Sequence, residues 1–174
     1  MTDFTIMPYT KIDGIPTFKD SQLIGMYDRI VDEEKGYVFS DGTINDGNAF
    51  VEMAKRPDTS FYAVYQGETI VLVVWLNRFE GAMARMNWCS FKSVSFETKL
   101  EAGRYVIKTL TDKVVDLLVG YTPASNKGAI KAAELCGGKI LGTVPNLVWN
   151  EQEQKSKEGV IIYYEKGSGH EDIQ

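Results

Sequence analysis

The hydrophobic residues of this chain gather in short runs separated by polar and glycine-rich segments. The clearest run, TIVLVVWL at Thr69–Leu76, is continuous and mostly β-branched or aliphatic. This composition is typical of a strand that is buried on both faces of a sheet. A second apolar run, Val114–Val119, ends where Gly120 and Pro123 interrupt strand pairing. The pattern therefore predicts two buried strands, with Thr69–Leu76 at the centre of the sheet.

Alternation of polar and apolar residues predicts a further strand at Met83–Phe91. One face would carry Ala84, Met86 and Trp88, and the other Arg85, Asn87 and Cys89. Such a strand is half-buried, and its polar side chains face either water or a cleft. Shorter apolar runs predict four more strands, at Phe4–Met7, Ser60–Tyr65, Lys139–Val144 and Val160–Glu165. We expect the first of these at an edge, Pro145 to stop the third, and a polar loop over residues 150–159.

Two segments of the amino-terminal third have apolar residues at helical spacing. The segment Phe18–Val31 carries them on one stripe, with Asp20 or Ser21 as candidate N-caps and Gly36 as the expected end. Asp46–Lys55 has the same periodicity over a shorter length. The segment between these helices, residues 37–48, reads as an ordinary solvated connection.

The segment Val114–Asn146 forms one strand-helix-strand unit with clear boundaries. Ser125 or Asn126 can cap its helix, and alanines then recur at helical spacing. Gly137 and Gly138 are expected to end the helix, because glycine tolerates the left-handed conformation that commonly closes one.

The segment Ser93–Lys113 permits two interpretations. In the first, Ser95 caps a helix that runs over residues 96–114, and Gly103 is an interior glycine that close packing would explain. In the second, the helix begins near Glu101, the preceding residues form a loop, and Gly103 lets a ligand approach the backbone. The sequence leaves both interpretations open.

Composition indicates one domain with an ordinary core. The chain has 174 residues, 44% of them hydrophobic, and we assign residues 1–166 to a single domain and 167–174 to a flexible tail.

Nineteen basic and twenty-four acidic residues give a net charge of −5, which argues against binding to nucleic acid or anionic membranes. No apolar run approaches the roughly 20 residues of a spanning helix. The amino end lacks the features of a secretion signal, so we expect a cytoplasmic protein.

Cysteine and histidine are too few for several kinds of site. The chain has two cysteines, Cys89 and Cys136, and one histidine, His170 in the polar tail. A structural zinc site needs four such ligands, so no metal is expected. A nucleophile activated by histidine is disfavoured because the base would come from the terminus. Both cysteines are expected to be buried thiols.

The string YTPASNKGAIKAAELCGGKILGTVPN, Tyr121–Asn146, resembles the GNAT superfamily of acyl-CoA dependent N-acyltransferases, in particular a divergent variety often met in phage genomes. It is similar to that family's fifth strand, the asparagine that opens the next helix, the glycine that closes it, and the strand after. The resemblance extends over nearly the whole chain. It implies an α/β fold: a mixed, mostly antiparallel sheet of six or seven strands with helices on both faces.

The resemblance also implies acetyl-CoA or another acyl-CoA as co-substrate. It makes Met83–Phe91 the family's fourth strand, whose free edge pairs with the pantetheine arm. It would also make Tyr37–Asn48 a region that faces the acceptor substrate. The family's phosphate-binding pattern, [QR]-x-x-G-x-[GA], aligns with residues 98–103, where Thr98 replaces Gln or Arg and Glu101 replaces glycine. The residues implied to bind the cofactor are Cys89, Ser90, Phe91, Leu100, Glu101, Ala102, Gly103, Arg104 and Asn126.

Glu101 is the main departure from the family pattern on this alignment. Its carboxylate would lie where the pyrophosphate is expected, and at about 4 Å and an effective dielectric near 20 each repulsive pair costs about 4 kcal/mol. Lys99 and Arg104 would offset this charge locally.

A second departure concerns proton transfer. Many family members carry a tyrosine seven residues after the helix-opening asparagine, and here that position is Ala133. Tyr121 and Ser125 are the nearest substitutes as proton donors, although Tyr121 also reads as a packing residue. The candidate general bases are Glu68, Glu80 and Glu97, each of which also reads as a surface carboxylate.

Two functions follow from these residues and the resemblance. The first is an acyl-CoA dependent N-acyltransferase acting on an unidentified small-molecule or peptide amine, with a homodimer as a further expectation. The second is a non-catalytic GNAT-fold protein that serves in binding or assembly, for example in a phage.

Overall fold

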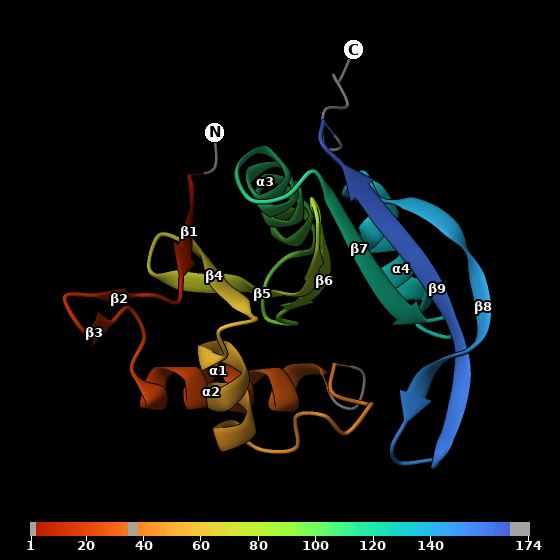
Figure 1. Ribbon diagram of the computed structural model, residues 1–174, viewed down its shortest axis with the longest axis horizontal. Coiled ribbons are helices and arrows are strands. Elements are labelled where there is room, and N and C mark those ends of the chain that lie inside the picture. Colours follow the sequence, from red (N-terminus) through yellow and green to blue (C-terminus); the bar gives the residue numbers. More distant parts are fainter. Residues whose placement is uncertain (1–2, 35–37, 168–174) are drawn as a thin grey trace.

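The computed structural model describes residues 3–34 and 38–167. Their elements, in chain order, are β1 Phe4–Pro8, β2 Lys11–Ile12, β3 Ile15–Pro16, α1 Asp20–Glu34, α2 Gly47–Lys55, β4 Ser60–Gln66, β5 Thr69–Glu80, β6 Met83–Ser90, α3 Phe96–Lys113, β7 Leu117–Pro123, α4 Lys127–Leu135, β8 Lys139–Asn150 and β9 Lys155–Glu165. Seven strands form one sheet in the order β1-β4-β5-β6-β7-β9-β8, and β2 and β3 form a small hairpin beside it (Figure 1).

The sheet is mostly antiparallel, as the sequence predicts. Every neighbouring pair runs antiparallel except β6 and β7, which run parallel. The predicted edge strand, now β1, lies at one edge, and the apolar run at Thr69–Leu76 lies within β5 in the middle of the amino-terminal half of the sheet. The expected α/β architecture with a mixed, mostly antiparallel sheet is confirmed.

Helices cover both faces of the sheet and create two hydrophobic clusters. Helices α1 and α2 lie below the sheet in Figure 1, and α3 lies above it. Residues of α4 join the cluster on the α3 side. Strand β5 serves both clusters, because it gives Leu72, Val74 and Leu76 to the α3 side and Val73 and Trp75 to the other. Full burial of such side chains stabilises the fold by about 1.5 to 3 kcal/mol each.

Helix α3 begins at Phe96, which decides between the two interpretations of this segment. Ser95 is the N-cap, and its Oγ accepts a hydrogen bond from the backbone N–H of Thr98 at 3.2 Å. The alternative start near Glu101 is therefore wrong. Gly103 is an interior glycine held at a close contact: an added Cβ would lie 2.7 Å from Cys136 Sγ and 2.8 Å from the Trp88 ring.

Helix α4 has the boundaries that its sequence indicates. Asn126, one of the two predicted caps, accepts a hydrogen bond from Ala129 N–H through Oδ1 at 3.2 Å. At the other end Gly137 has φ +90°, and Gly138 N–H donates to Ala133 O at 2.9 Å. This pattern of bonds closes the helix in the way expected of paired glycines.

Three boundaries in the carboxy-terminal half differ from the sequence-based prediction. Val114 and Val115 close helix α3, so β7 begins at Leu117 and continues to Pro123. Strand β8 passes through Pro145 to Asn150, with a register shift between Val144 and Val148. An edge strand tolerates this proline because its missing N–H need not enter the ladder. The predicted loop over residues 150–159 is shorter, since β9 starts at Lys155.

The predicted helix of the amino-terminal third is present but shifted. Helix α1 begins at Asp20, so Ser21 lies inside it, and it continues to Glu34. The second predicted helix is confirmed as α2, with Asp46 as its N-cap. Gly36, the tail beyond Gly167 and His170 lie outside the described residues.

Candidate functional site

The parallel strands β6 and β7 separate along their length and leave a cleft between them. They pair only where residues 83–85 of β6 meet residues 117–119 of β7. Beyond that point the strands diverge, and a cavity of about 450 Å³ occupies the space. Its walls also include residues from the first half of α3 and from α4.

The cleft is lined by residues from both faces of the sheet. Residues that pack on the α3 side are Met86, Trp88, Leu100, Ala129 and Ala133. Residues directed to the α1 and α2 side are Val38, Trp75, Asn87, Cys89 and Tyr121. Two molecules that approach from opposite faces of the sheet could therefore meet between β6 and β7.

Strand β6 presents a free backbone edge to this cleft. Residues 86–90 pair with β5 on one side, but no strand pairs with them on the other. Unpaired N–H and C=O groups of a strand edge readily accept an extended chain that carries amide groups. Ser90 lies at the end of this edge and lines the cleft.

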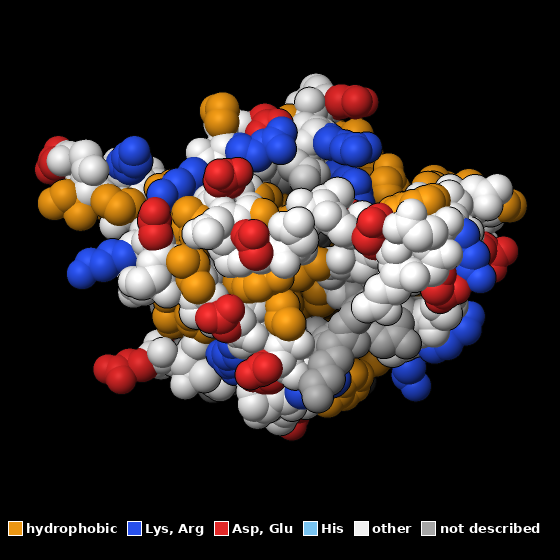
Figure 2. All heavy atoms as spheres, turned by 90° about the horizontal axis from the view of Figure 1, so that it is seen from below, with side chains coloured by type: hydrophobic (Ala, Val, Ile, Leu, Met, Phe, Trp, Pro, Cys, Tyr) orange, Lys and Arg blue, Asp and Glu red, His pale blue; other side chains and the backbone are white. Residues whose placement is uncertain are grey.

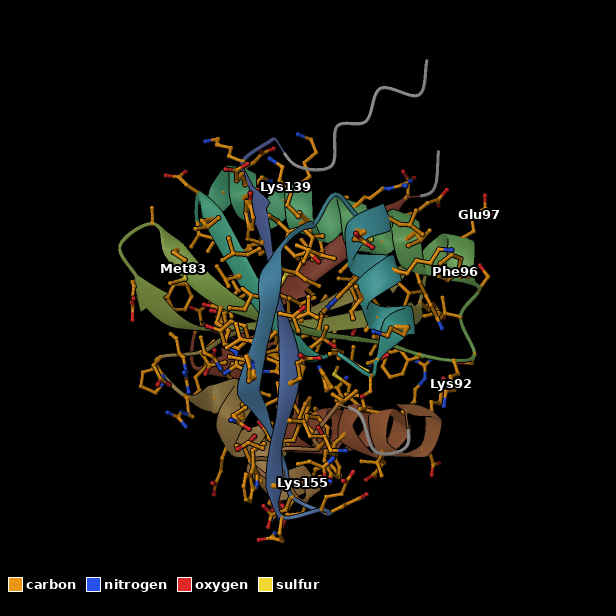
Figure 3. All side chains as sticks on the ribbon, turned by 90° about the vertical axis from the view of Figure 1, so that its right-hand side faces the viewer. Met83, Lys92, Phe96, Glu97, Lys139 and Lys155 are labelled. Atoms are coloured by element: carbon orange, nitrogen blue, oxygen red, sulfur yellow. The ribbon has the colours of Figure 1, made fainter. Side chains whose placement is uncertain are left out.

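The N-terminus of α3 and the loop before it form another wall, which includes two basic side chains. Lys92 and Lys99 line the cleft, and neither forms an ion pair with any described residue. In Figure 3, Lys92 and Phe96 lie at the same end of α3, with Glu97 beside them. The first N–H groups of a helix lack intrahelical partners and attract anions. Here Ser95 Oγ takes Thr98 N–H, so Phe96 and Glu97 keep theirs available.

A polar network fixes the loop that leads from β6 to α3. The Glu33 carboxylate of α1 accepts a hydrogen bond from Ser93 N–H at 2.8 Å, and Arg29 Nε donates to Glu33 at 2.8 Å. The Arg29 guanidinium also lies 3.6 Å from the centroid of the Phe91 ring. Although burial would raise the pKa of Glu33, the hydrogen bonds from Ser93 and Arg29 lower that pKa overall.

Polar side chains gather where β6 and β7 begin to separate, on the face of α1 and α2. Among the described residues, Asn77 Oδ1, Arg85 Nε and Asn87 Nδ2 are buried without a hydrogen-bond partner. The Arg85 guanidinium lies 4.7 Å from the centroid of the Tyr121 ring. Burial lowers the pKa of Arg85, and the nearby charge of Arg78 lowers it further.

The structure brings five of the predicted site residues into the cleft. They are Cys89, Ser90, Leu100, Tyr121 and Asn126. Five other predicted residues do not line the cleft. Phe91 is buried in the cluster on the α1 and α2 side, and Ala102 and Gly103 are buried in the core on the α3 side. Glu101 and Arg104 lie in the second and third turns of α3. Their backbone N–H groups belong to the helix, because the helix begins before them. Arg104 Nε donates to Leu135 O instead.

None of the three predicted general bases lines the cleft. Glu68 lies in the turn between β4 and β5, Glu80 ends β5, and Glu97 lies in the first turn of α3; all three are exposed. Among the described residues, no Asp or Glu lines the cleft. Ala133, at the position where the family has a tyrosine, is buried in the cleft wall. Two tyrosines line the cleft: Tyr164 is buried, and burial raises its pKa, whereas Tyr121 is exposed.

Several lining residues were not recognised from the sequence. Trp75 lies within an apolar run and read only as core, although it lines the cleft. Lys92 carried no motif, and Lys99 was expected only to offset the charge of Glu101; both line the cleft. The alternation at Arg85 and Asn87 did predict a polar face that meets water or a cleft.

The described residues form neither a recognisable metal site nor a helix suited to spanning a membrane. The described part of the chain contains no group of three or more His, Cys, Asp or Glu side chains that could hold a metal ion. None of its helices combines the length and hydropathy needed to cross a membrane. Neither cysteine takes part in a disulfide, and both are buried. Burial raises the pKa of Cys136 to about 11, so this thiol is a weak nucleophile.

Solved structures share this architecture. No family model matches the sequence, and no curated protein matches it. A probable GNAT-family acetyltransferase from Chromobacterium violaceum superposes with a TM-score of 0.71 at 13% identity, over 95% of this chain and 88% of that one. The ribosomal-protein-S18-alanine N-acetyltransferase of Escherichia coli gives 0.66 at 13% identity, over 99% of both chains.

A third structure is the spermidine N-acetyltransferase of Vibrio cholerae in complex with CoA and spermine. It superposes with a TM-score of 0.69 at 9% identity, over 95% of this chain and 97% of that one. Identities this low carry the architecture and not the substrate. The chain is therefore an α/β protein with the GNAT fold.

Proposed function

We propose that this protein is an acyl-CoA dependent N-acyltransferase. The observation that carries the proposal is the cleft between β6 and β7, which is lined from both faces of the sheet. A transferase for two substrates needs such a passage, because the acyl donor and the amine must meet with their reacting atoms about 3 to 3.5 Å apart. The GNAT fold of the chain supports the same function.

The residues of the cleft fit an acyl-CoA. The free edge of β6 at residues 86–90 offers N–H and C=O groups to the amides of a pantetheine arm. The N–H groups of Phe96 and Glu97, with the unpaired ammonium groups of Lys92 and Lys99, would hold the phosphates. Bound acyl-CoA supplies an acyl group activated as a thioester.

The chain itself contributes positioning and a candidate proton donor. The cleft walls hold the two reactants and exclude water, which accounts for most of the rate that direct aminolysis requires. Tyr121 holds a proton on its phenolic oxygen at the cleft mouth, and we assign it the role of proton donor to the leaving sulfur. Ala133 cannot do this.

The test of the function is transfer of radiolabelled acetyl groups from acetyl-CoA to a panel of amines, with release of free thiol measured in parallel. We expect label in at least one amine and stoichiometric thiol. Tyr121→Phe should lower kcat about a hundredfold, with the same KM for acetyl-CoA and the same melting temperature.

Tyr163→Phe is the matched control. Tyr163 lies on β9 outside the cleft wall, so this substitution should leave kcat unchanged.

Two features favour the alternative, non-catalytic function. The segment that leads into α3, FKSVS, contains no glycine, and Ser93 N–H already donates its hydrogen bond to Glu33. Absence of both cofactor binding and acetyl transfer would support that alternative, a GNAT-fold protein that has lost the cofactor, and contradict the proposal.

A further inference from the structure

Three unpartnered polar atoms lie together on neighbouring strands. The structure describes four buried side-chain atoms without a hydrogen-bond partner, and three of them belong to Asn77, Arg85 and Asn87. Asn77 on β5 is the cross-strand partner of Arg85 on β6, and Asn87 is two residues further along the same face. A buried polar atom without a partner costs about 1 to 3 kcal/mol in general, so such a group requires an explanation.

The cluster borders the cleft, and Asn87 is the one of its three residues that lines the cavity. Asn87 and Tyr121 line the cavity, and Arg85 packs against the Tyr121 ring. Arg85 is also the last β6 residue that pairs with β7, so it marks the point of separation. All of these side chains face α1 and α2, opposite the side where α3 and α4 wall the cleft.

The charge of this cluster is not balanced by the protein. Arg85 forms no hydrogen bond or ion pair with a described residue. Arg78 adds a second positive charge near Arg85. Asp41 is the nearby negative charge, but it does not contact Arg85, and its carboxylate accepts a hydrogen bond from Thr43. Figure 2 shows both acidic and basic side chains on the α1 and α2 side of the molecule. A half-buried guanidinium without a carboxylate partner is suited to binding an anion.

We infer that the acceptor is an amine that carries a carboxylate group, as an amino acid does. This inference rests on the proposed acyltransferase function. Arg85 Nε and Asn87 Nδ2 donate to the carboxylate, and the Asn77 amide, which can present either its oxygen or its NH2, completes the contact. The amine of the same molecule then extends toward the cleft.

The same site disfavours the other common amine classes. A polyamine carries only positive charge, and it would meet Arg85 and Arg78 with no acidic side chain in the described cleft wall. A peptide amide offers a carbonyl but lacks the charge that a guanidinium binds best. In the transfer itself, the N–C amide bond forms as the thioester C–S bond breaks, and the proton lost by the amine ends on the thiol.

The experiment compares matched acceptors. L-amino acids, their carboxamides and spermidine are assayed with acetyl-CoA, and each is also tested alone for its effect on the melting temperature. At least one amino acid should exceed its carboxamide at least tenfold in kcat/KM and should raise the melting temperature without acetyl-CoA. Arg85→Gln should remove this acid-to-amide preference while the carboxamide rate persists. Arg56→Gln, an exposed arginine paired with Asp58, is the control and should keep the preference.

A second variant covers the case in which Arg85→Gln does not fold. Asn87→Asp places a negative charge in the cleft wall, so it should lower kcat/KM for the acid at least tenfold and spare the carboxamide. Equal loss for acid and carboxamide, or spermidine as the preferred acceptor, would overturn the inference. Stabilisation by an amino acid that depends on Arg85, without any acetyl transfer, would retain the carboxylate site and refute the transferase. The carboxylate site is refuted if no amino acid raises the melting temperature and no acid is preferred to its carboxamide.

Discussion

Gly103 of α3 lies close to Cys136, the C-cap of α4, and to Trp88 of β6. A methyl group there would lie 2.7 Å from Cys136 Sγ and 2.8 Å from the Trp88 ring. Overpacking of this kind costs about 1 to 3 kcal/mol, which exceeds the gain of about 0.5 to 1 kcal/mol from replacing a helical glycine. Gly103→Ala should therefore lower the free energy of unfolding measured in urea. Gly25→Ala in α1 is the control, because nothing lies within 4 Å of its added Cβ, and it should stabilise the protein.

Asn126 combines a structural and a positional role at the start of α4. Its Oδ1 caps the helix, and the residue lines the cleft. Asn126→Ala should cost about 0.5 to 2 kcal/mol in urea unfolding because one backbone N–H loses its partner. Asn126→Asp keeps an acceptor oxygen and should cost much less. An unchanged unfolding midpoint for the alanine variant would contradict the assigned cap.

The loop between β6 and α3 depends on α1 for its shape. Arg29 joins three elements, since its Nη1 donates to Ile70 O at 2.8 Å and its Nη2 to Ser93 Oγ at 2.9 Å. Glu33 receives the Ser93 N–H. Because hydrogen bonds to a charged group contribute about 1.5 to 3 kcal/mol, Glu33→Gln should lower the free energy of unfolding by a similar amount at pH 7.

The pKa of Glu33 gives this prediction a pH dependence. A carboxyl whose pKa is lowered by folding stabilises the native state above its unfolded value, which is about 4.3, and this contribution is lost as the pH falls through the lower folded value. The stability difference between the wild type and Glu33→Gln should therefore shrink below about pH 4. Glu52→Gln on the exposed side of α2 is the control and should differ little at either pH. A difference for Glu33→Gln that is the same at pH 3 and pH 7 would contradict the assigned network.

At the scale of the whole molecule, the sequence predicts the layers better than the site. Periodicity locates β5, β6, α2 and α4 because each buries its own apolar pattern. The start of α3 was ambiguous from the sequence. Ser95 is a favourable N-cap for a helix from residue 96, whereas a helix that begins near Glu101 would leave Gly103 to let a ligand approach the backbone. Packing of Gly103 against α4 resolves the ambiguity, and this is a contact between distant segments. The extension of β8 through Pro145 was missed because an edge strand relaxes a rule that holds inside a sheet.

The site was predicted least well because it is formed by the separation of two strands. No local pattern indicates that β6 and β7 pair over three residues and then diverge. Lys92, Lys99 and Trp75 become lining residues only through that divergence. The polar face at Arg85 and Asn87 was visible as alternation, but its lack of partners is a tertiary property.

The cleft can be filled without touching its polar groups. Ala129 is half-buried on the wall that α4 provides, whereas Lys131, two residues later, is exposed and outside the wall. Ala129→Phe should occupy the volume that an acyl-CoA requires. Lys131→Phe adds the same ring on the exposed side of α4 and serves as the matched control.

The most direct measurement is the melting temperature of these proteins with and without CoA. At a hundred times its dissociation constant, CoA should stabilise the wild type by about 2.7 kcal/mol and raise its melting temperature by roughly 5 to 10 °C. The Lys131→Phe variant should show the same rise, and Ala129→Phe should show none. An equal rise in Ala129→Phe would place the ligand outside the cleft, and no rise in the wild type at millimolar CoA would contradict the proposed use of acyl-CoA.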